Sequence, residues 1–153
     1  MVANSKIDKV SPSDLHLEIL PRATKKAFLK CAENPFFANS LWYLAGGTAL
    51  GLQVGHRQSL DLDFFTTESS LSILSLERQM MNQGVWLTDF GDEGTLYGRF
   101  MKAKASFIAY PFFVPKQNYI RYGTLNILQP LDIAVMKIVA ISQRGKKRDF
   151  FDL

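Results

Sequence analysis

The chain is poor in cysteine and histidine and has no long apolar run. Its 153 residues include one cysteine and two histidines. Cys31 cannot form an internal disulfide, and because it occupies an apolar position of a helical pattern we expect a buried, unreactive thiol. A lone histidine such as His56 is poor evidence for a metal site. No stretch reaches the roughly 18 apolar residues of a membrane span, and the first residues lack the apolar core of a signal peptide, so we predict a cytoplasmic protein.

Composition and charge set the broad class. A hydrophobic content of 47% is enough for a core, and the length fits a single domain over residues 1–153. The net charge of +4 is unevenly placed. Basic residues gather in the segment RGKKRD near the C-terminus and in one predicted helix, at Arg22, Lys25, Lys26 and Lys30. Two interpretations stay open: a site for a polyanionic partner, or a solvated basic face.

Helical and strand patterns alternate along the chain. Ser11 before Pro12 predicts a helix start, and Pro21 splits or kinks the helical region over residues 12–34. Further helices are predicted over residues 70–83 and 130–143. The segments LWYLAGG and SLDLDFF predict strands on either side of a short helix, TALGLQVG. The segments VWLTDF, TLYGRFMKA, ASFIAYPFF and GTLNILQ are typical of a short antiparallel meander, so we predict a mixed β-sheet flanked by helices, an α/β (α+β) fold.

A glycine turn joins the first of these strands to the short helix. Gly46 and Gly47 allow a ligand to approach the main chain, and the helix that follows, from Thr48, aims free amides and its positive dipole end outward. Arg57 and Ser59, in the connection to the next strand, supply a guanidinium and a hydroxyl that suit phosphate oxygens. These residues favour a phosphate site. A structural turn with a local loop brace is the alternative.

Asp61 and Asp63 lie two residues apart in the second strand. Alternation along a strand places both on one face, about 6–7 Å apart, and predicts that Leu60, Leu62 and Phe64 face the core. Two like charges this close repel unless a cation or hydrogen-bond donors lie between them. Mg²⁺ binds through one or two carboxylates plus substrate phosphates. Beside a phosphate-type turn, the pair therefore favours a metal-bound phosphate over two solvated side chains.

The segment LAGGTALGLQVGHRQSLDLDFF, residues 44–65, resembles the signature of nucleotidyltransferases of the AbiEii/AbiGii toxin family, within the DNA polymerase beta-like superfamily. That signature is a glycine turn followed by Asp-x-Asp. The segment LDIAVMKIVAISQRGKKRDFFDL is similar to the family's later part: a lysine on a helix, an Arg-Gly turn, then Asp-aromatic-x-Asp. The resemblance implies a nucleotidyltransferase-like mixed sheet with N-terminal helices and a C-terminal helix. Family members commonly continue into a helical C-terminal region, which this chain would lack.

The resemblance implies roles for the first segment. Gly46, Gly47 and Thr48 would hold the β- and γ-phosphates of a nucleoside triphosphate. Asp61 and Asp63 would bind Mg²⁺ or Mn²⁺ and act in catalysis. The two motifs together would bring the triphosphate and its metal to one place.

It also implies roles for the flanking residues. Arg57 and Ser59 would lie beside the triphosphate, and Lys137 would reach a phosphate or the ribose. Asp149, with Asp152 as helper, would line the nucleotide pocket or orient Lys137. An ordinary surface lysine is the alternative for Lys137.

The implied activity is Mg²⁺-dependent transfer of a nucleotide to an acceptor, with RNA such as transfer RNA as the implied acceptor and a cognate antitoxin as the implied partner. Two-metal transfer normally uses a third carboxylate on a neighbouring strand, and the segments GRFMKAKASFIAYPFF and GTLNILQ contain none. Ser106 or Asn126 would occupy that place, while Asp89 and Asp92 read as strand-end and turn residues. A nucleotide-binding pseudoenzyme of the same fold and an RNA- or protein-binding module are therefore alternative functions.

Overall fold

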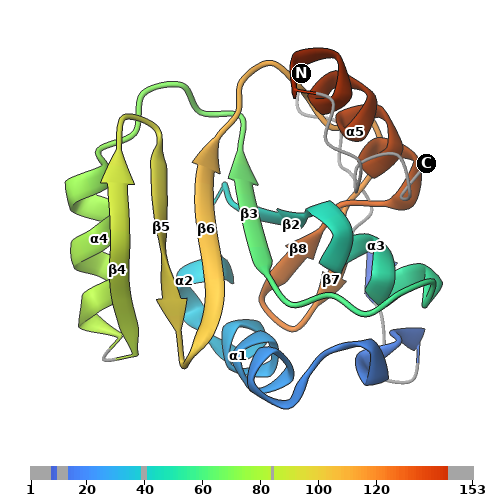
Figure 1. Ribbon diagram of the computed structural model, residues 1–153, viewed down its shortest axis with the longest axis horizontal. Helices are drawn as coiled ribbons and strands as arrows, with labels where there is room; N and C mark the ends of the chain where they lie inside the picture. Colours follow the sequence, from blue (N-terminus) through green and yellow to red (C-terminus); the bar gives the residue numbers. More distant parts are fainter. Residues whose placement is uncertain (1–7, 10–13, 39–40, 84, 145–153) are drawn as a thin grey trace.

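The computed structural model describes residues 8–9, 14–38, 41–83 and 85–144. Eight strands form one mixed sheet in the order β1-β7-β8-β2-β3-β6-β5-β4 (Figure 1). The strands are β1 (Asp8–Lys9), β2 (Tyr43–Ala45), β3 (Leu62–Thr66), β4 (Trp86–Asp92), β5 (Thr95–Phe100), β6 (Ala103–Ala109), β7 (Ile120–Tyr122) and β8 (Leu125–Ile127). The helices are η2 (Leu17–Ile19, a 3-10 turn), α1 (Arg22–Glu33), α2 (Pro35–Ala38), α3 (Gly46–Val54), α4 (Ile73–Asn82) and α5 (Pro130–Arg144). The expected mixed sheet with flanking helices is confirmed.

Pro21 decides where the first long helix begins. Its φ of −56° and missing N–H suit the position before α1, whose first residue is Arg22. Among the described residues, the strand β1 and the 3-10 turn η2 precede it, and the predicted helix start at Ser11 and Pro12 lies outside the described residues. Cys31 of α1 is 1% exposed, and burial raises its pKa to about 12, so the predicted buried thiol is confirmed. No helix within the described ranges has the length and apolar character that crossing a membrane requires.

One face of the sheet, which we call the core face, is covered by α1 and α2. Phe64 and Phe107 are neighbours on β3 and β6, and each is 1% exposed. Phe37 of α2 packs on Phe64, with ring centroids 4.8 Å apart. Phe28 of α1 stacks on Tyr122 of β7 at 5.3 Å. Strand alternation then turns the residues next to Phe64 and Phe107 toward the opposite face, which we call the cavity face.

The predicted meander is correct for three strands and wrong for the fourth. β4, β5 and β6 pair antiparallel in sequence order, and α4, with Leu76 and Met80 buried, packs against β4 and β5. GTLNILQ forms β8, which lies on the far side of the sheet, parallel to β2 and antiparallel to the unpredicted β7. A parallel partner distant in sequence leaves no local signal, and adjacency along the chain suggested the wrong neighbour.

The strand that was predicted to carry both aspartates begins later than expected, so that it includes Asp63 but not Asp61. β3 runs from Leu62, and its burial alternates, with Leu62, Phe64 and Thr66 inside. The prediction for Leu60 is wrong, because its side chain is 63% exposed. Leu60 lies before the first strand residue, and its carbonyl accepts a hydrogen bond of 2.8 Å from Thr24 Oγ1. The strand alternation therefore does not extend back to this position.

Candidate functional site

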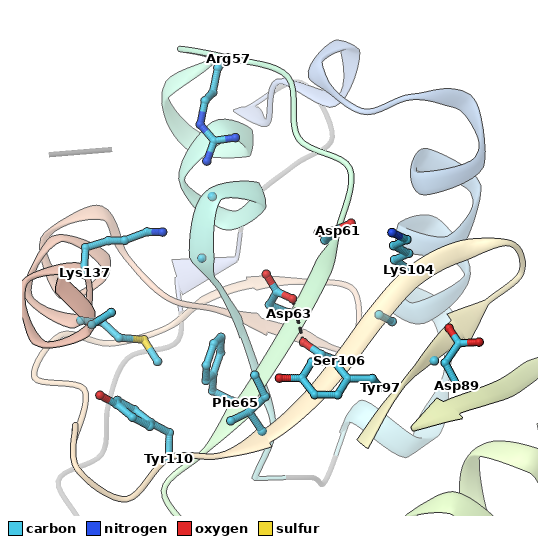
Figure 2. A pocket seen from close by; sticks show the side chains of 17 residues that line it. Arg57, Asp61, Asp63, Phe65, Asp89, Tyr97, Lys104, Ser106, Tyr110 and Lys137 are labelled. Atoms are coloured by element: carbon cyan, nitrogen blue, oxygen red, sulfur yellow. Dashed lines mark hydrogen bonds between the residues drawn. The ribbon is translucent and has the colours of Figure 1, made fainter. Parts of the chain in front are cut away.

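A cavity of about 620 Å³ opens on the cavity face of the sheet. Its volume lies within the range of small-molecule sites. Figure 2 shows β3 at its centre, with α3 and α5 on one side and β6, β5 and β4 on the other. The lining residues are Gly46, Gly47, Arg57, Asp61, Asp63, Phe65, Asp89, Tyr97, Gly98, Lys104, Ala105, Ser106, Ile108, Tyr110, Met136, Lys137 and Ala140.

The glycine elbow, Gly46 and Gly47 at the start of α3, lies directly against two charged side chains. Gly46 has a φ of +72°, a conformation that favours glycine, and a Cβ built there would lie 3.2 Å from Asp63 Oδ2. A Cβ at Gly47 would collide with the guanidinium of Arg57. The first amides of a helix have no partner within the helix, so this end offers donors to an anion. The elbow, Arg57 and Asp63 thus converge at one wall of the cavity.

Thr48 and Ser59 were expected at the phosphates, but neither side chain lines the cavity. Both are buried, and their hydroxyls share a hydrogen bond of 2.5 Å. Thr48 Oγ1 also donates to the carbonyl oxygen of Asp61. The two hydroxyls therefore tie α3 to the chain segment that carries Asp61. This arrangement corresponds to the loop brace that the sequence left open for Ser59.

Asp63 and Phe65 of β3 line the cavity, as alternation predicts, and so does Asp61, which directly precedes the strand. Asp63 faces Ser106 across the parallel β3–β6 pair, and Ser106 Oγ donates a hydrogen bond of 2.7 Å to Asp63 Oδ1 (Figure 2). Two half-buried carboxylates with a neighbouring hydroxyl form an all-oxygen donor set, which suits Mg²⁺ when phosphate oxygens complete its coordination. The oxygen donors of these side chains are thus of the type that such an ion prefers.

Of the two residues suggested for the place of a third carboxylate, Ser106 lies beside Asp63. Asn126 on β8 and Asp92 at the end of β4 do not line the cavity. Asp89 lines its far end, three strands from Asp63, and pairs with Arg99 at 3.5 Å. Within the described residues, no group of three histidine, cysteine or acidic side chains is arranged to hold a metal ion.

Helix α5 lies on the same side of β3 as α3 and contacts it (Figure 2). Lys137 lines the cavity together with Met136 and Ala140, as a helix-borne lysine was expected to do. Behind Phe65, Tyr43 and Tyr119 stack at 5.3 Å, and burial raises the pKa of Tyr119 to about 12. This side of the cavity therefore combines an aromatic stack behind Phe65 with the amino group of Lys137. Asp149 and Asp152 lie outside the described residues.

Several lining residues were missed from the sequence. Lys104 and Tyr97 face the cavity from β6 and β5, and Tyr110 follows the end of β6. Alternation along KAKASFIA could have placed Lys104 on the same side as Ser106. The sequence contains no comparable indication for Tyr97, because the side of the sheet that Tyr97 faces depends on the register in which β5 pairs with β6.

The protein has an α+β fold, and in its cavity a glycine elbow lies next to two carboxylates. Residues 27–93 match the family described as nucleotidyl transferase AbiEii toxin, type IV TA system. The resemblance stated from the sequence is thereby confirmed, and the matched range includes the elbow and both aspartates. Over 117 residues the chain is 41% identical to an uncharacterized protein of Aquifex aeolicus (strain VF5), covering 73% of this chain and 55% of the relative. The chain therefore spans about half the length of the curated relative that it matches.

Proposed function

We propose that the chain is a Mg²⁺-dependent nucleotidyltransferase, which moves a nucleotide from a nucleoside triphosphate to an acceptor hydroxyl. One observation carries the proposal: the elbow and the carboxylate strand meet, with only 3.2 Å between a Cβ at Gly46 and Asp63 Oδ2. A triphosphate bound at the elbow and Arg57 is thus next to carboxylates that suit its metal. The family match over residues 27–93 supports the same activity.

Each wall of the cavity has a task in this reaction. The elbow amides and Arg57 bind the β- and γ-phosphates and stabilise the charge that develops on pyrophosphate. Lys137 approaches from α5 and binds a phosphate or the ribose, with Asp149 and Asp152 as its proposed helpers. Asp61 and Asp63 orient the metal, and Mg²⁺ bound there would neutralise charge on the phosphates. The acceptor oxygen bonds to the α-phosphorus as the bond to the bridging oxygen breaks, pyrophosphate leaves and the acceptor proton passes to water.

We propose RNA, such as a transfer RNA end, as the acceptor and an antitoxin as a protein partner. The net charge of +4 supports a polyanionic acceptor. The family description, a toxin of type IV toxin–antitoxin systems, supports the second partner. Growth arrest on expression, relieved by co-expression of an antitoxin candidate, would test that partner.

A nucleotide-binding protein without transferase activity is the second candidate, and Ser106 favours it. Ser106 presents a neutral hydroxyl to Asp63 where two-metal enzymes use a further carboxylate. A hydroxyl does not accept a proton from the acceptor at neutral pH. Binding without chemistry follows if that carboxylate is required for transfer.

An incorporation assay separates the two candidates. The protein is incubated with Mg²⁺, bulk RNA and nucleoside triphosphates that are labelled on either the α- or the γ-phosphorus. Nucleotidyl transfer puts α-label into the acceptor and leaves γ-label in pyrophosphate. Triphosphate binding without incorporation supports the second candidate, and failure to bind any triphosphate with Mg²⁺ contradicts both.

A further inference from the structure

The cavity continues beyond the carboxylates onto an exposed part of the sheet. The cavity face of β4, β5 and β6 has no described helix in front of it (Figure 1). Two exposed aromatic residues lie there: Phe90 is 55% exposed and Tyr97 is 44% exposed. Their ring centroids are 6.3 Å apart. Beside them, two basic residues lie opposite each other on adjacent strands, Arg99 on β5 and Lys104 on β6. We call these four residues the β4–β6 platform.

The platform is in register with the proposed reaction centre. Asp63 pairs with Ser106, Ser106 with Tyr97, and Tyr97 with Phe90, so one row of side chains crosses four strands. With adjacent strands about 4.8 Å apart, Tyr97 lies about 10 Å and Phe90 about 14 Å along the sheet from the strand of Asp63. Figure 2 shows the Tyr97 ring beside Ser106. A chain lying along this row would end at the carboxylates.

The geometry of the proposed reaction also indicates that the acceptor enters from the β6 side of β3. In-line displacement requires the attacking oxygen to lie opposite the leaving pyrophosphate. The elbow that would hold pyrophosphate follows β2, on one side of β3, and β6 lies on the other side. The acceptor must therefore enter over β6, where the platform begins.

From this geometry we infer that the β4–β6 platform binds the end of a single-stranded polynucleotide, an inference that rests on the proposed nucleotidyl transfer. Tyr97 and Phe90 stack unpaired bases, which is how sheet surfaces hold single strands. Lys104 and Arg99 bind backbone phosphates. The Arg99–Asp89 pair is exposed on both sides, and such pairs contribute little, so a phosphate can replace Asp89.

The basic helix α1 is the competing surface. Its exposed cations include Lys25 and Lys30, but α1 packs on the core face through Phe28. A polynucleotide bound there would not reach Asp63 by the row described above. If the platform binds RNA, substitutions in the platform weaken RNA binding and substitutions of the α1 lysines do not; if α1 binds RNA, the reverse holds.

The test is fluorescence anisotropy of a short labelled single-stranded RNA with the full chain, without nucleotide or Mg²⁺. Tyr97→Ala and Phe90→Ala are each expected to weaken binding about tenfold, whereas Tyr97→Phe retains it. Lys104→Ala should weaken binding and lower the slope of log affinity against log salt by about 0.7. Phe112→Ala, at a 75% exposed aromatic residue outside the platform, and Lys30→Ala on α1 are matched controls expected to bind like wild type.

Three results would overturn the inference: wild type that binds no single strand, duplex RNA bound as tightly as single-stranded RNA, or a loss confined to Lys25→Ala and Lys30→Ala. Because both aromatic side chains are partly exposed, the melting temperatures of the variants should match that of wild type. If Tyr97→Ala alone is unstable, the RNA affinities of Phe90→Ala and Lys104→Ala test the platform instead. Platform-dependent RNA binding without incorporation of α-label would disprove the transferase alone. Incorporation into a small molecule or protein without RNA binding would disprove the platform alone.

Discussion

The two ends of the cavity are built in contrasting ways. At the elbow end, α3 contacts α5, and the buried Thr48–Ser59 pair ties α3 to the segment before β3. A Cβ at Gly46 or Gly47 would meet Asp63 or Arg57, so these positions have no spare room. At the platform end, Tyr97 and Phe90 stand on antiparallel strands with half of each side chain exposed. The elbow positions atoms closely, and the platform presents an adaptable surface.

This difference predicts how the protein responds to substitution. Changes at the elbow end alter the geometry of charged groups that act together, so their effects should be large and selective for the chemistry. Changes at the platform end remove one stacking or phosphate contact at a time, so their effects should be moderate and selective for the acceptor.

The largest effect is expected for Asp63→Asn. The substitution keeps the shape of the side chain and its hydrogen bond from Ser106 while removing the charge. Incorporation of α-label should fall about a thousandfold, because a bound metal contributes several kcal/mol to such transition states. Asp89→Asn, at the platform end and paired with Arg99, is the control and should keep incorporation within about tenfold of wild type. Equal losses in the two variants would contradict the contrast between the ends.

A smaller effect is expected for Gly46→Ala, with Gly94→Ala as its matched control. Both glycines have a φ of +72°, so alanine costs about 1 kcal/mol of backbone strain at either position. Only at Gly46 does the new Cβ press on Asp63; at Gly94 the nearest atom is Ala109 Cβ at 3.6 Å. Thermal melting should fall in both variants. Incorporation should fall about a hundredfold in Gly46→Ala alone, and a similar loss in Gly94→Ala would attribute the effect to folding.

The elbow end could be predicted from the sequence because its parts are local. Gly46, Arg57 and Asp63 lie within 18 residues, and the antiparallel pairing of β2 with β3 returns the chain to its starting point. Asp61 and Asp63 line the same cavity, as predicted, although Asp61 lies just before β3. Local patterns could not show that Thr48 and Ser59 turn inward to pair with each other, since a hydroxyl suits a phosphate and a buried partner equally.

The platform end depends on pairing that the sequence does not display. β3 and β6 are parallel neighbours, and the pairing of Asp63 with Ser106 spans 43 residues. Until that register is known, neither the facing of Tyr97 nor the row from Asp63 to Phe90 can be drawn. The same reason explains why β8 was assigned to the meander. Asp149 and Asp152 stay predictions.

The boundary between the two ends is Ser106, and Ser106→Asp tests what it does there. A third carboxylate beside Asp63 should tighten Mn²⁺ binding roughly tenfold, because affinity for hard cations rises with the number of charged ligands. Without metal the added charge should lower the melting temperature, since like charges then face each other across β3 and β6. Ser106→Asn is the neutral control. Unchanged Mn²⁺ titrations in Ser106→Asp would show that this position lies outside the metal site.

The smallest effect is expected at Cys31, which is buried in α1 on the core face. Burial raises its pKa from 9.0 to about 12, so the folded chain keeps the neutral thiol where the unfolded chain ionises. This contribution to stability is present below pH 9 and is lost as the pH rises from 9 toward 12. Thiol-reagent labelling at pH 8 should therefore follow unfolding only, and Tyr97→Ala should leave its rate unchanged. A rate that rises in Tyr97→Ala would mean that the platform supports the core, and the two ends would then not be separable by substitution.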